Sequence, residues 1–576
     1  MESFVNRLQG RPGPSGHDLV SLPLHSMRNS EETTLNNRSL HDAEDGDDDG
    51  DADPLLPSAA GTIERVKAEI EHELGSSEGD TGYDRKSKII NKAIQDIGMG
   101  KYQWQLFSLC GMGWLADNLW MQGLALVLPQ LTPEFGVSVS HIRYTTMVTF
   151  IGLSIGSTFW GIASDIIGRK PAFNITLLLC GLFGTLVALG PTWAITALLF
   201  ACMGLGVGGN LPVDGALFLE FLPFESNKLL TLLSVWWPVG QLIASILAWM
   251  LIPRWSCDPE LIPCSGSSSA PCCASSDNRG WRFYIASLGL TTLFMFVCRF
   301  FLFRLYESPK YLLSRGRQSE AVSVVQTIAR YNGTNTWLTE DILVEFGDDV
   351  DDGAPKLTVM EINKRNMSKF SLDKVGALFA DRRLAITTVL LWFMWAAIGM
   401  GYPLFNAFLP QYLEHAGEDS APVSADVAYR NFFITSIAAV PGSIIAAYTV
   451  DVKSLGRKGT MAISTLISGV FLYLFIVSDD PTYQMICSAI ESFFQNVMYG
   501  VLYAYTPEVF PAPCRGTGTG IASLLNRMAG ITAPIIAAQM GEVHPSAPIL
   551  AAGACYLAAS VAMILLPIET RGIQSL

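Results

Sequence analysis

The sequence predicts an all-α membrane protein whose twelve transmembrane helices form two pseudosymmetric six-helix bundles. Half of the residues are apolar and only 16% are charged, whereas an ordinary soluble domain has about 25% charged residues. About twelve apolar segments each approach the ~20 residues that a membrane-spanning helix needs. The same number of positions separates Gly168 from Pro223 and Gly456 from Pro511, and such an internal repeat is typical of duplicated membrane bundles.

Residues 1–100 are expected to form a disordered, acidic, cytosolic N-terminal tail. Residues 31–84 contain 17 Asp and Glu against 3 Lys and Arg, which accounts for the formal net charge of −14. Few aromatic residues are available there to bury apolar surface. The tail also lacks the apolar core of a signal peptide, so the first membrane helix should direct insertion. Leu55-Leu56 follows an acidic run and matches a dileucine sorting signal, and a chance Leu-Leu pair is the alternative.

The membrane part is predicted to comprise an N-terminal bundle (101–304), a cytosolic central insert (305–383) and a C-terminal bundle (384–567). A short cytosolic tail, 568–576, follows. The twelve apolar segments lie at about 105–129, 142–166, 172–190, 194–222, 229–252, 282–304, 384–409, 431–450, 460–477, 482–505, 516–540 and 547–567.

Lys and Arg in the short loops predict the orientation of the helices. Basic residues concentrate before the first helix, between the second and third, before the seventh, and between the eighth and ninth. Because such loops remain in the cytosol, both termini and the insert should be cytosolic. No basic face is clustered as nucleic-acid binding requires, so the expected partners are the lipid bilayer and a small-molecule substrate, with no nucleic acid.

Four cysteines fall in the loop between the fifth and sixth helices, on the side where disulfides persist. At least one disulfide is therefore expected, with the pairing left open. A zinc site is the alternative, although the loop contains no His. These cysteines are Cys257, Cys264, Cys272 and Cys273.

Four ionisable residues are predicted to lie inside membrane helices, where charges are costly and usually functional. Asp117, Asp214 and Glu491 are candidates to carry a proton, because burial favours the protonated form of a carboxyl group. Arg527 is a candidate partner or substrate ligand. The alternative for each carboxylate is a structural salt bridge. Trp114, together with Trp120 or Met121, is expected to share one helix face with Asp117.

Neutral polar residues within the helices are candidates to bind substrate, with interhelical packing as the alternative. A glycine-rich run, Gly204 to Gly209, follows no strand and should permit close helix packing instead of binding a dinucleotide. The polar candidates are Gln241, Tyr402, Asn406, Gln495 and Asn496.

A repeated charged loop is predicted to gate conformational change. A carboxylate near a cytosolic helix end can accept hydrogen bonds from a neighbouring helix N-terminus or an Arg, and such contacts would hold one face closed. The gate candidates are Gly161, Asp165, Gly168, Arg169, Lys170 and Glu220 in the first copy, with Asp451, Gly456, Arg457, Lys458, Glu508 and Arg515 in the second.

These loops carry a resemblance to a known family. Gly161-x3-Asp165-x2-Gly168-Arg169-Lys170 looks like the signature loop of the major facilitator superfamily. Residues 306–312 and 567–572 resemble the Pro-Glu-Ser-Pro-Arg and Pro-Glu-Thr-Lys-Gly motifs of its sugar porters. Residues 505–516 look most like the branch of synaptic-vesicle-2-related proteins and their fungal members. The resemblance implies the superfamily fold and alternating access around a central cavity.

The sequence departs from the group at three positions. Phe200 stands where related carriers have an Arg tied to proton transfer, and Ala397-Ile398 replaces the Gln-Gln pair of hexose carriers. Trp120 stands where a Glu commonly follows the Asp of the first helix. These departures weaken the expectations of hexose specificity and of proton coupling.

The resemblance implies a secondary active transporter that moves a sugar-like solute or an organic anion, with proton symport expected. Efflux of a metabolite or drug is the alternative, but Trp237-Pro238-Val-Gly240 lacks the motif of drug antiporters. A non-transporting nutrient sensor is a weaker alternative. No nucleophile–base constellation or metal cluster predicts an enzyme, and no cofactor is expected. The protein is expected to act as a monomer in the plasma membrane. If Leu55-Leu56 acts as a sorting signal, a vacuolar or endosomal membrane is expected instead.

Overall fold

The fold comes from a computed structural model. The structure describes residues 82–223, 228–257, 262–263, 272–273, 277–301, 303–345, 372–410, 412, 424–450, 452–511, 514–544 and 546–570. The predicted sorting signal Leu55-Leu56 and the gate candidate Asp451 lie outside these residues. The chain divides into the units Met1–Thr81 and Gly82–Leu576, and the second unit contains every element below.

Six membrane-spanning segments form the N-terminal half, close to the predicted ranges. The fifth segment is broken at Ser234-Val235 into two helices. The elements are α4 (Lys101–Phe135), α6 (Tyr144–Ile167), α7 (Arg169–Val187), α8 (Trp193–Phe221), α9 (Lys228–Leu233) with α10 (Trp236–Leu251), and α11 (Gly280–Phe301).

Six further segments form the C-terminal half. The seventh segment ends in a π-helical turn, which begins at Pro403. The elements are α17 (Arg382–Tyr402) with η3 (Pro403–Ala407), α19 (Ala425–Thr449), α20 (Gly456–Phe475), α21 (Pro481–Val509), α22 (Arg515–Val543) and α23 (Ala547–Leu565).

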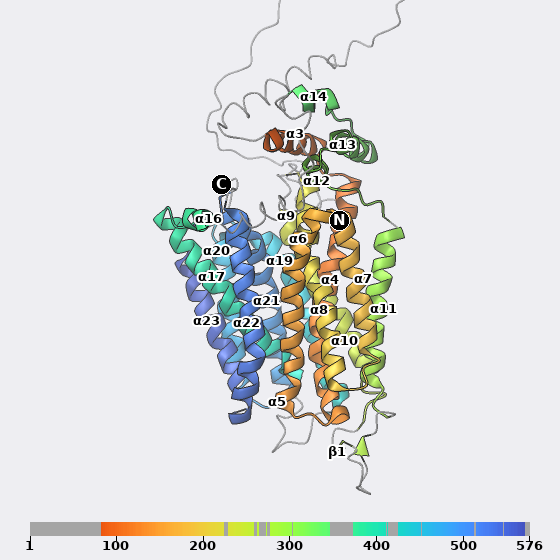
Figure 1. Cartoon of the computed structure of the whole chain (residues 1–576). Coiled ribbons are helices and arrows are strands. Elements are labelled where there is room, and N and C mark those ends of the chain that lie inside the picture. The colour runs from red at the N-terminus through yellow and green to blue at the C-terminus, as the bar shows by residue number, and fades with distance from the viewer. Residues whose placement is uncertain are drawn as a thin grey trace, which may run out of the picture. The chain divides into compact units, whose positions relative to one another are not determined.

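Helix packing in one half is repeated in the other. In the N-terminal half, α8 packs against α6 and α7, and α21 packs in the same way against α19 and α20. The pairs α4 with α10 and α7 with α11 likewise correspond to α17 with α22 and α20 with α23. The predicted pseudosymmetric pair of six-helix bundles is thereby confirmed (Figure 1).

Glycines allow α6 and α8 to pack backbone against backbone. A Cβ at Gly204 or Gly208 would collide with the carbonyl oxygen of Thr149 or Leu153 in α6. Gly152 and Gly156 of α6 face the carbonyls of α8 in the same way. Small residues permit this close approach in membranes, where apolar surface alone does not drive helices together.

Ten of the described helices are long and apolar enough to cross a membrane by length and composition. The helices α4 and α21 are also long, 35 and 29 residues, but carry more polar side chains, including Asp117 and Glu491. Helices satisfy their own backbone hydrogen bonds, which lipid cannot do for them. Large apolar side chains such as Phe294 and Leu198 are more than half exposed on the outside of the fold, as lipid contact requires.

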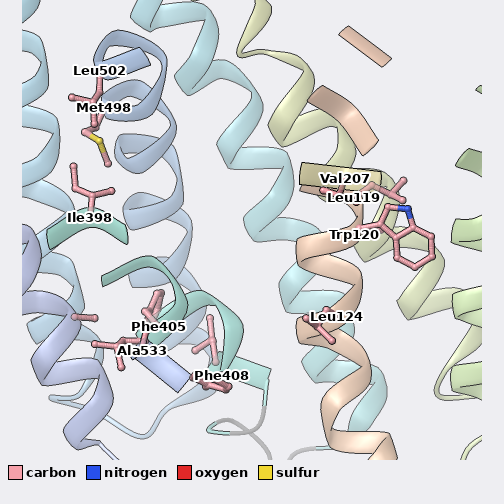
Figure 2. Packing of buried hydrophobic residues seen from close by; sticks show 14 of the residues in the cluster. Leu119, Trp120, Leu124, Val207, Ile398, Phe405, Phe408, Met498, Leu502 and Ala533 are labelled. Carbon is pink, nitrogen blue, oxygen red and sulfur yellow. The ribbon is translucent and has the colours of Figure 1, made fainter. Parts of the chain in front are cut away.

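The buried apolar residues of the two halves form one cluster (Figure 2). Leu119, Trp120 and Val207 line it from the N-terminal half, and Phe405 and Met498 line it from the C-terminal half. The Trp120 indole donates to Thr292 Oγ1 of α11 at 3.0 Å. The expectation that Trp120 shares a face with Trp114 is therefore wrong, because six residues of helix turn the side chain toward α11 and away from the other half.

The expected disorder of residues 1–100 is wrong for its last part, because Gly82–Ile97 forms helix α3. Ile89, Ile90, Ala93, Ile94 and Ile97 repeat at helical spacing and are buried. Tyr83 Oη donates to the carbonyl of Lys310, and Trp337 Nε1 donates to Asp96. The helix thus packs on the central insert, whose helices are α12 (Pro309–Ser314), α13 (Gln318–Asn332), α14 (Glu340–Glu345) and α16 (Leu372–Ala377).

The ends of the bundle carry different elements (Figure 1). One end, here called the insert end, carries α3, α12 and α13. The other, here called the disulfide end, carries α5 (Val139–Ile142) and a two-stranded parallel pairing of β1 (Ile262–Pro263) with β2 (Cys272–Cys273).

Candidate functional site

At the insert end, the first charged loop forms a cluster within the N-terminal half. Arg169 lies 2.6 Å from Asp165 and 3.4 Å from Glu220, and so ties α7 to α6 and α8. Glu307 Oε1 accepts from the backbone N–H of Arg169 at 2.9 Å. This carboxylate therefore caps the N-terminus of α7, where the helix dipole favours an anion. Burial raises the pKa of Glu307 above its ordinary value, and the backbone N–H donors oppose that rise.

The C-terminal half repeats this cluster. Arg457 forms an ion pair with Glu508, and Glu569 accepts from the backbone N–H groups of Arg457 at 3.1 Å and Lys458 at 3.0 Å. Arg515 donates to the carbonyl of Phe510 at 3.3 Å. Each charged loop thus connects helices of a single half. Any role in gating would therefore be exerted through the conformation of that half.

Two glycines with left-handed backbone angles lie at the N-terminal ends of these capped helices. The φ angle is 108° at Gly168 and 59° at Gly456. Side chains with a Cβ rarely adopt such angles, so glycine is required at both positions. At Gly161, by contrast, nothing lies within 4 Å of a Cβ that would be added.

Between the halves lies an aromatic cluster, here defined as Trp114, Trp237, Trp395, Tyr499 and Tyr503. Trp114 of α4 stacks on Trp237 of α10 with ring centroids 4.6 Å apart. Tyr503 of α21 meets the rings of Trp237 and Trp395 at 4.7 Å each. Flat aromatic faces from both halves therefore converge at one place.

Polar groups join the halves beside this cluster. Tyr402 Oη donates to Asn118 Oδ1 at 3.3 Å, and Asn118 Nδ2 donates to the carbonyl of Trp237 at 3.1 Å. The predicted residue Asp117 is 6% exposed and accepts from Asn210 Nδ2 at 3.2 Å. A phenol and an amide thus join the halves beside the aromatic cluster, and a carboxylate bonded to a second amide lies one position earlier in α4.

Arg527 of α22 lies on the same inner region. Its Nη1 donates to the carbonyl of Leu153 in α6 at 3.2 Å, and its charge acts on Tyr503 and Asp117. The Nε atom is buried without an acceptor. No carboxylate forms an ion pair with Arg527 among the residues that the structure describes.

Asp214 has a different environment from Asp117. Its Oδ2 lies 2.8 Å from Arg299 Nη2 of α11, and both side chains are fully buried. Arg299 also donates to the carbonyls of Leu109 and Phe173 and lies over the Phe173 ring. This geometry favours the salt-bridge alternative for Asp214 over a role in carrying protons.

Glu491 of α21 is 1% exposed within the C-terminal half. Gln495 Nε2 donates to Glu491 Oε1 at 2.8 Å and to Tyr556 Oη of α23 at 2.7 Å. Glu491 Oε2 has no hydrogen-bond partner. A carboxyl group, an amide and a phenol thus form a buried polar chain.

The remaining polar candidates lie near these groups or within one helix. Asn406 and Tyr402 line a small cavity between α4, α6 and η3, together with Thr146 and Gln122. Gln241 is buried in α10, and Asn496 Nδ2 donates to the carbonyl of Ser492 in its own helix.

At the disulfide end, the halves are held together by several contacts. Arg143 of the N-terminal half donates to the carbonyl of Ala537 in α22. Tyr429 of α19 donates to the carbonyl of Leu126, and Trp249 donates to Asp426 at 3.0 Å. The structure therefore represents a state in which the halves meet at this end.

The loop at this end contains the disulfide Cys257–Cys273, which confirms the expectation of at least one disulfide among the four cysteines. Cys264 and the side chain of Cys272 lie outside the described residues.

Comparisons with known proteins agree with this architecture. The family model described as Major Facilitator Superfamily matches residues 109–451 and 423–575. An MFS siderochrome iron transporter 1 of Ceriporiopsis subvermispora is 40% identical over 86% of this chain and 93% of its own. The chain belongs to the major facilitator superfamily. It is accordingly a multi-pass membrane protein and a secondary active transporter of small solutes.

Other superfamily members extend the likeness. The niacin transporter NiaP of Acinetobacter baylyi is 29% identical over 78% of this chain and 90% of its own. The synaptic vesicle 2-related protein of Pongo abelii is 28% identical over 84% and 81%. The xylose transporter XylE of E. coli, in a partially occluded inward-open conformation, has a TM-score of 0.59 at 19% identity over 82% of this chain and 99% of that one. The resemblance seen in the motifs is thus confirmed, and XylE supports the fold alone.

Several residues of this candidate site were not singled out from the sequence. They are Asn118, Trp237, Arg299, Tyr503 and Tyr556. Arg299 carried a usable signal, a charge inside a predicted membrane helix. The aromatic residues carried none, because apolar rings at helical spacing also occur in ordinary cores.

Proposed function

We propose that this superfamily member imports a small, planar organic anion together with a proton, with Arg527 and the aromatic cluster as its central site. The observation that carries the proposal is Arg527, a largely buried guanidinium facing Tyr503 and Asp117 without a paired carboxylate in the described part of the chain. A buried charge is costly unless it is paired. A substrate carboxylate would supply the missing partner through charge-assisted hydrogen bonds.

The aromatic cluster favours a flat ring over a sugar. Stacked and edge-on faces of Trp114, Trp237 and Tyr503 provide two to three surfaces for an aromatic solute. Trp114 Nε1 and Asn406 Nδ2 are buried N–H donors without acceptors, and an anion offers acceptors only. The niacin transporter NiaP, by its name, carries an aromatic carboxylic acid. This supports the organic-anion alternative over the sugar-like one.

Asp117 is the proposed proton carrier. The positive charge of Arg527 acts on Asp117 and favours its ionised form. An anionic substrate that binds Arg527 neutralises the positive charge that stabilises the Asp117 carboxylate. Asp117 then favours its protonated form. Anion and proton would therefore enter as a pair. Import follows from this coupling because protons enter cells down their gradient, and efflux remains the competing outcome. We place the carrier in the plasma membrane as a monomer.

The proposal is tested with purified protein in proteoliposomes and radiolabelled nicotinate, benzoate and xylose. Uptake of an aromatic acid should rise when the outside is acidic. Arg527→Gln should raise the KM by about 10- to 100-fold, because hydrogen bonds to charged groups contribute roughly 1.5–3 kcal/mol. Arg527→Lys, which keeps the charge, should lose less.

Asp117→Asn is the companion variant. It should abolish pH-driven accumulation while sparing counterflow exchange at equal pH. Transport of xylose but of neither acid, or unchanged kinetics in Arg527→Gln, would contradict the proposal. Loss of both activities in Asp117→Asn would assign that residue to substrate binding instead.

A further inference from the structure

Glu491 is a buried carboxyl that the proposed role of Asp117 leaves unexplained. The three buried carboxyl groups of the membrane helices differ in their cations. Arg299 pairs with Asp214, and the charge of Arg527 acts on Asp117. For Glu491, no cation lies in pairing distance among the described residues. An unpaired carboxylate at this depth costs about 3 kcal/mol or more.

The neighbours of Glu491 are neutral on every packed element for which contacts are described. Gln495 of its own helix donates to Oε1, and Ser468 of α20 donates to the Glu491 backbone carbonyl. The charge of Glu491 would act on Tyr402 of α17, Tyr499 of α21 and Tyr556 of α23. Since Gln495 divides its amide protons between Glu491 and Tyr556, only Oε2 is left free.

We infer that Glu491 is a second proton-binding site, in the C-terminal half, which is loaded at Oε2 in the state seen here. The unpartnered Oε2 and the absence of a paired cation in the described part of the chain fit a neutral carboxylic acid. The proton comes from hydronium in the aqueous phase: one of its O–H bonds breaks, an O–H bond forms at Glu491 Oε2, and water is released.

Tyr402 links this proton to the contact between the halves. In the present state its hydroxyl donates to Asn118 across the halves. When the halves part at the disulfide end, that bond is lost and the hydroxyl becomes free to donate to Glu491. A hydrogen bond to the ionised form stabilises it, so Glu491 would release its proton on opening and bind one on closing. Protonation would therefore favour closure at the disulfide end.

The role in transport rests on the proposed function, but proton binding can be tested without substrate. The full chain in lipid vesicles is titrated by infrared difference spectroscopy, which follows the carbonyl stretch of protonated carboxyl groups. Acidification should produce a band component that is lost in Glu491→Gln and present, at a shifted frequency, in Glu491→Asp. Asp117→Asn should remove a different component. Tyr402→Phe should make the Glu491 component appear at a higher pH.

A Glu491→Gln protein that folds with the wild-type titration intact would overturn the inference, since Glu491 would then never exchange its proton. If no aromatic acid is transported, the proposed function is wrong. The infrared titration then still tests whether Glu491 binds a proton.

Discussion

Individual carboxyl groups in this protein acquire different roles from the cations beside them. Asp117, Asp214 and Glu491 are all buried acids within membrane helices. Asp214 is neutralised by Arg299, Asp117 senses Arg527, and Glu491 has only neutral neighbours in the residues described. Charge compensation thus separates an ion pair from the two groups that are proposed to exchange protons.

Removing one partner of the Asp214–Arg299 pair should destabilise the protein strongly. Arg299→Met would leave the carboxylate buried without its cation, at a cost of about 3–5 kcal/mol. The double variant Asp214→Leu/Arg299→Met should recover most of this loss, because no unpaired charge remains. Thermal unfolding of the detergent-purified variants measures both effects. Equal melting temperatures for the wild type and Arg299→Met would show that the pair contributes nothing.

At the scale of elements, short interruptions and added helices position the site. The break before Trp236 places Trp237 on Trp114, and the π-turn at Pro403 follows Tyr402 directly. Proline lacks the N–H that would continue the helix, and π-turns often mark functional sites. Helix α3 adds a packed cover at the insert end.

Helix α3 sets a limit on truncation. Deleting residues 1–81 should preserve folding and transport, whereas deleting 1–97 should expose the apolar surface that Ile90 and its neighbours cover. Ile90→Asp should imitate the longer deletion, and Gln95→Asp, at an exposed position of the same helix, is the matched control. Fluorescence-detected size-exclusion chromatography reports the folded fraction. Wild-type behaviour of the deletion to residue 97 would show that α3 is dispensable.

For the whole molecule, two repeated halves are joined at the disulfide end and also through α9, which packs on α19 and α21. Ser245 and Ser436, within α10 and α19, are buried between the halves with hydroxyl oxygens 2.9 Å apart. Alternating access requires such contacts to separate, while each charged cluster at the insert end keeps its own half together.

A cross-link at this contact should stop transport. In Ser245→Cys/Ser436→Cys, oxidation should form a disulfide and abolish counterflow, because α10 and α19 could no longer part. Reduction should restore it, and each single variant, tested in the same way, should stay active. Undiminished counterflow in fully oxidised protein would mean that these helices move as one body during the cycle.

The sequence by itself determined the membrane class, the helix ranges, the repeat and the family. Apolar segment length, charged-loop spacing and motif residues are local properties, and the structure confirmed them to within a few residues. The sequence also predicted that Asp117, Glu491 and Arg527 lie within membrane helices, because an ionisable residue inside a long apolar segment is easily recognised. It assigned Trp120 to the wrong face and residues 82–97 to disorder, since helix rotation and docking depend on partners elsewhere in the chain.

Only the tertiary structure decided which groups meet. Arg299 is 85 positions from Asp214, and Tyr402 is 284 positions from Asn118. Pairing over such separations is fixed by how the membrane helices pack against one another. The sequence of a single helix does not determine it. The aromatic cluster exists for the same reason. Its rings come from both halves, and in each separate helix they are indistinguishable from residues of an ordinary core.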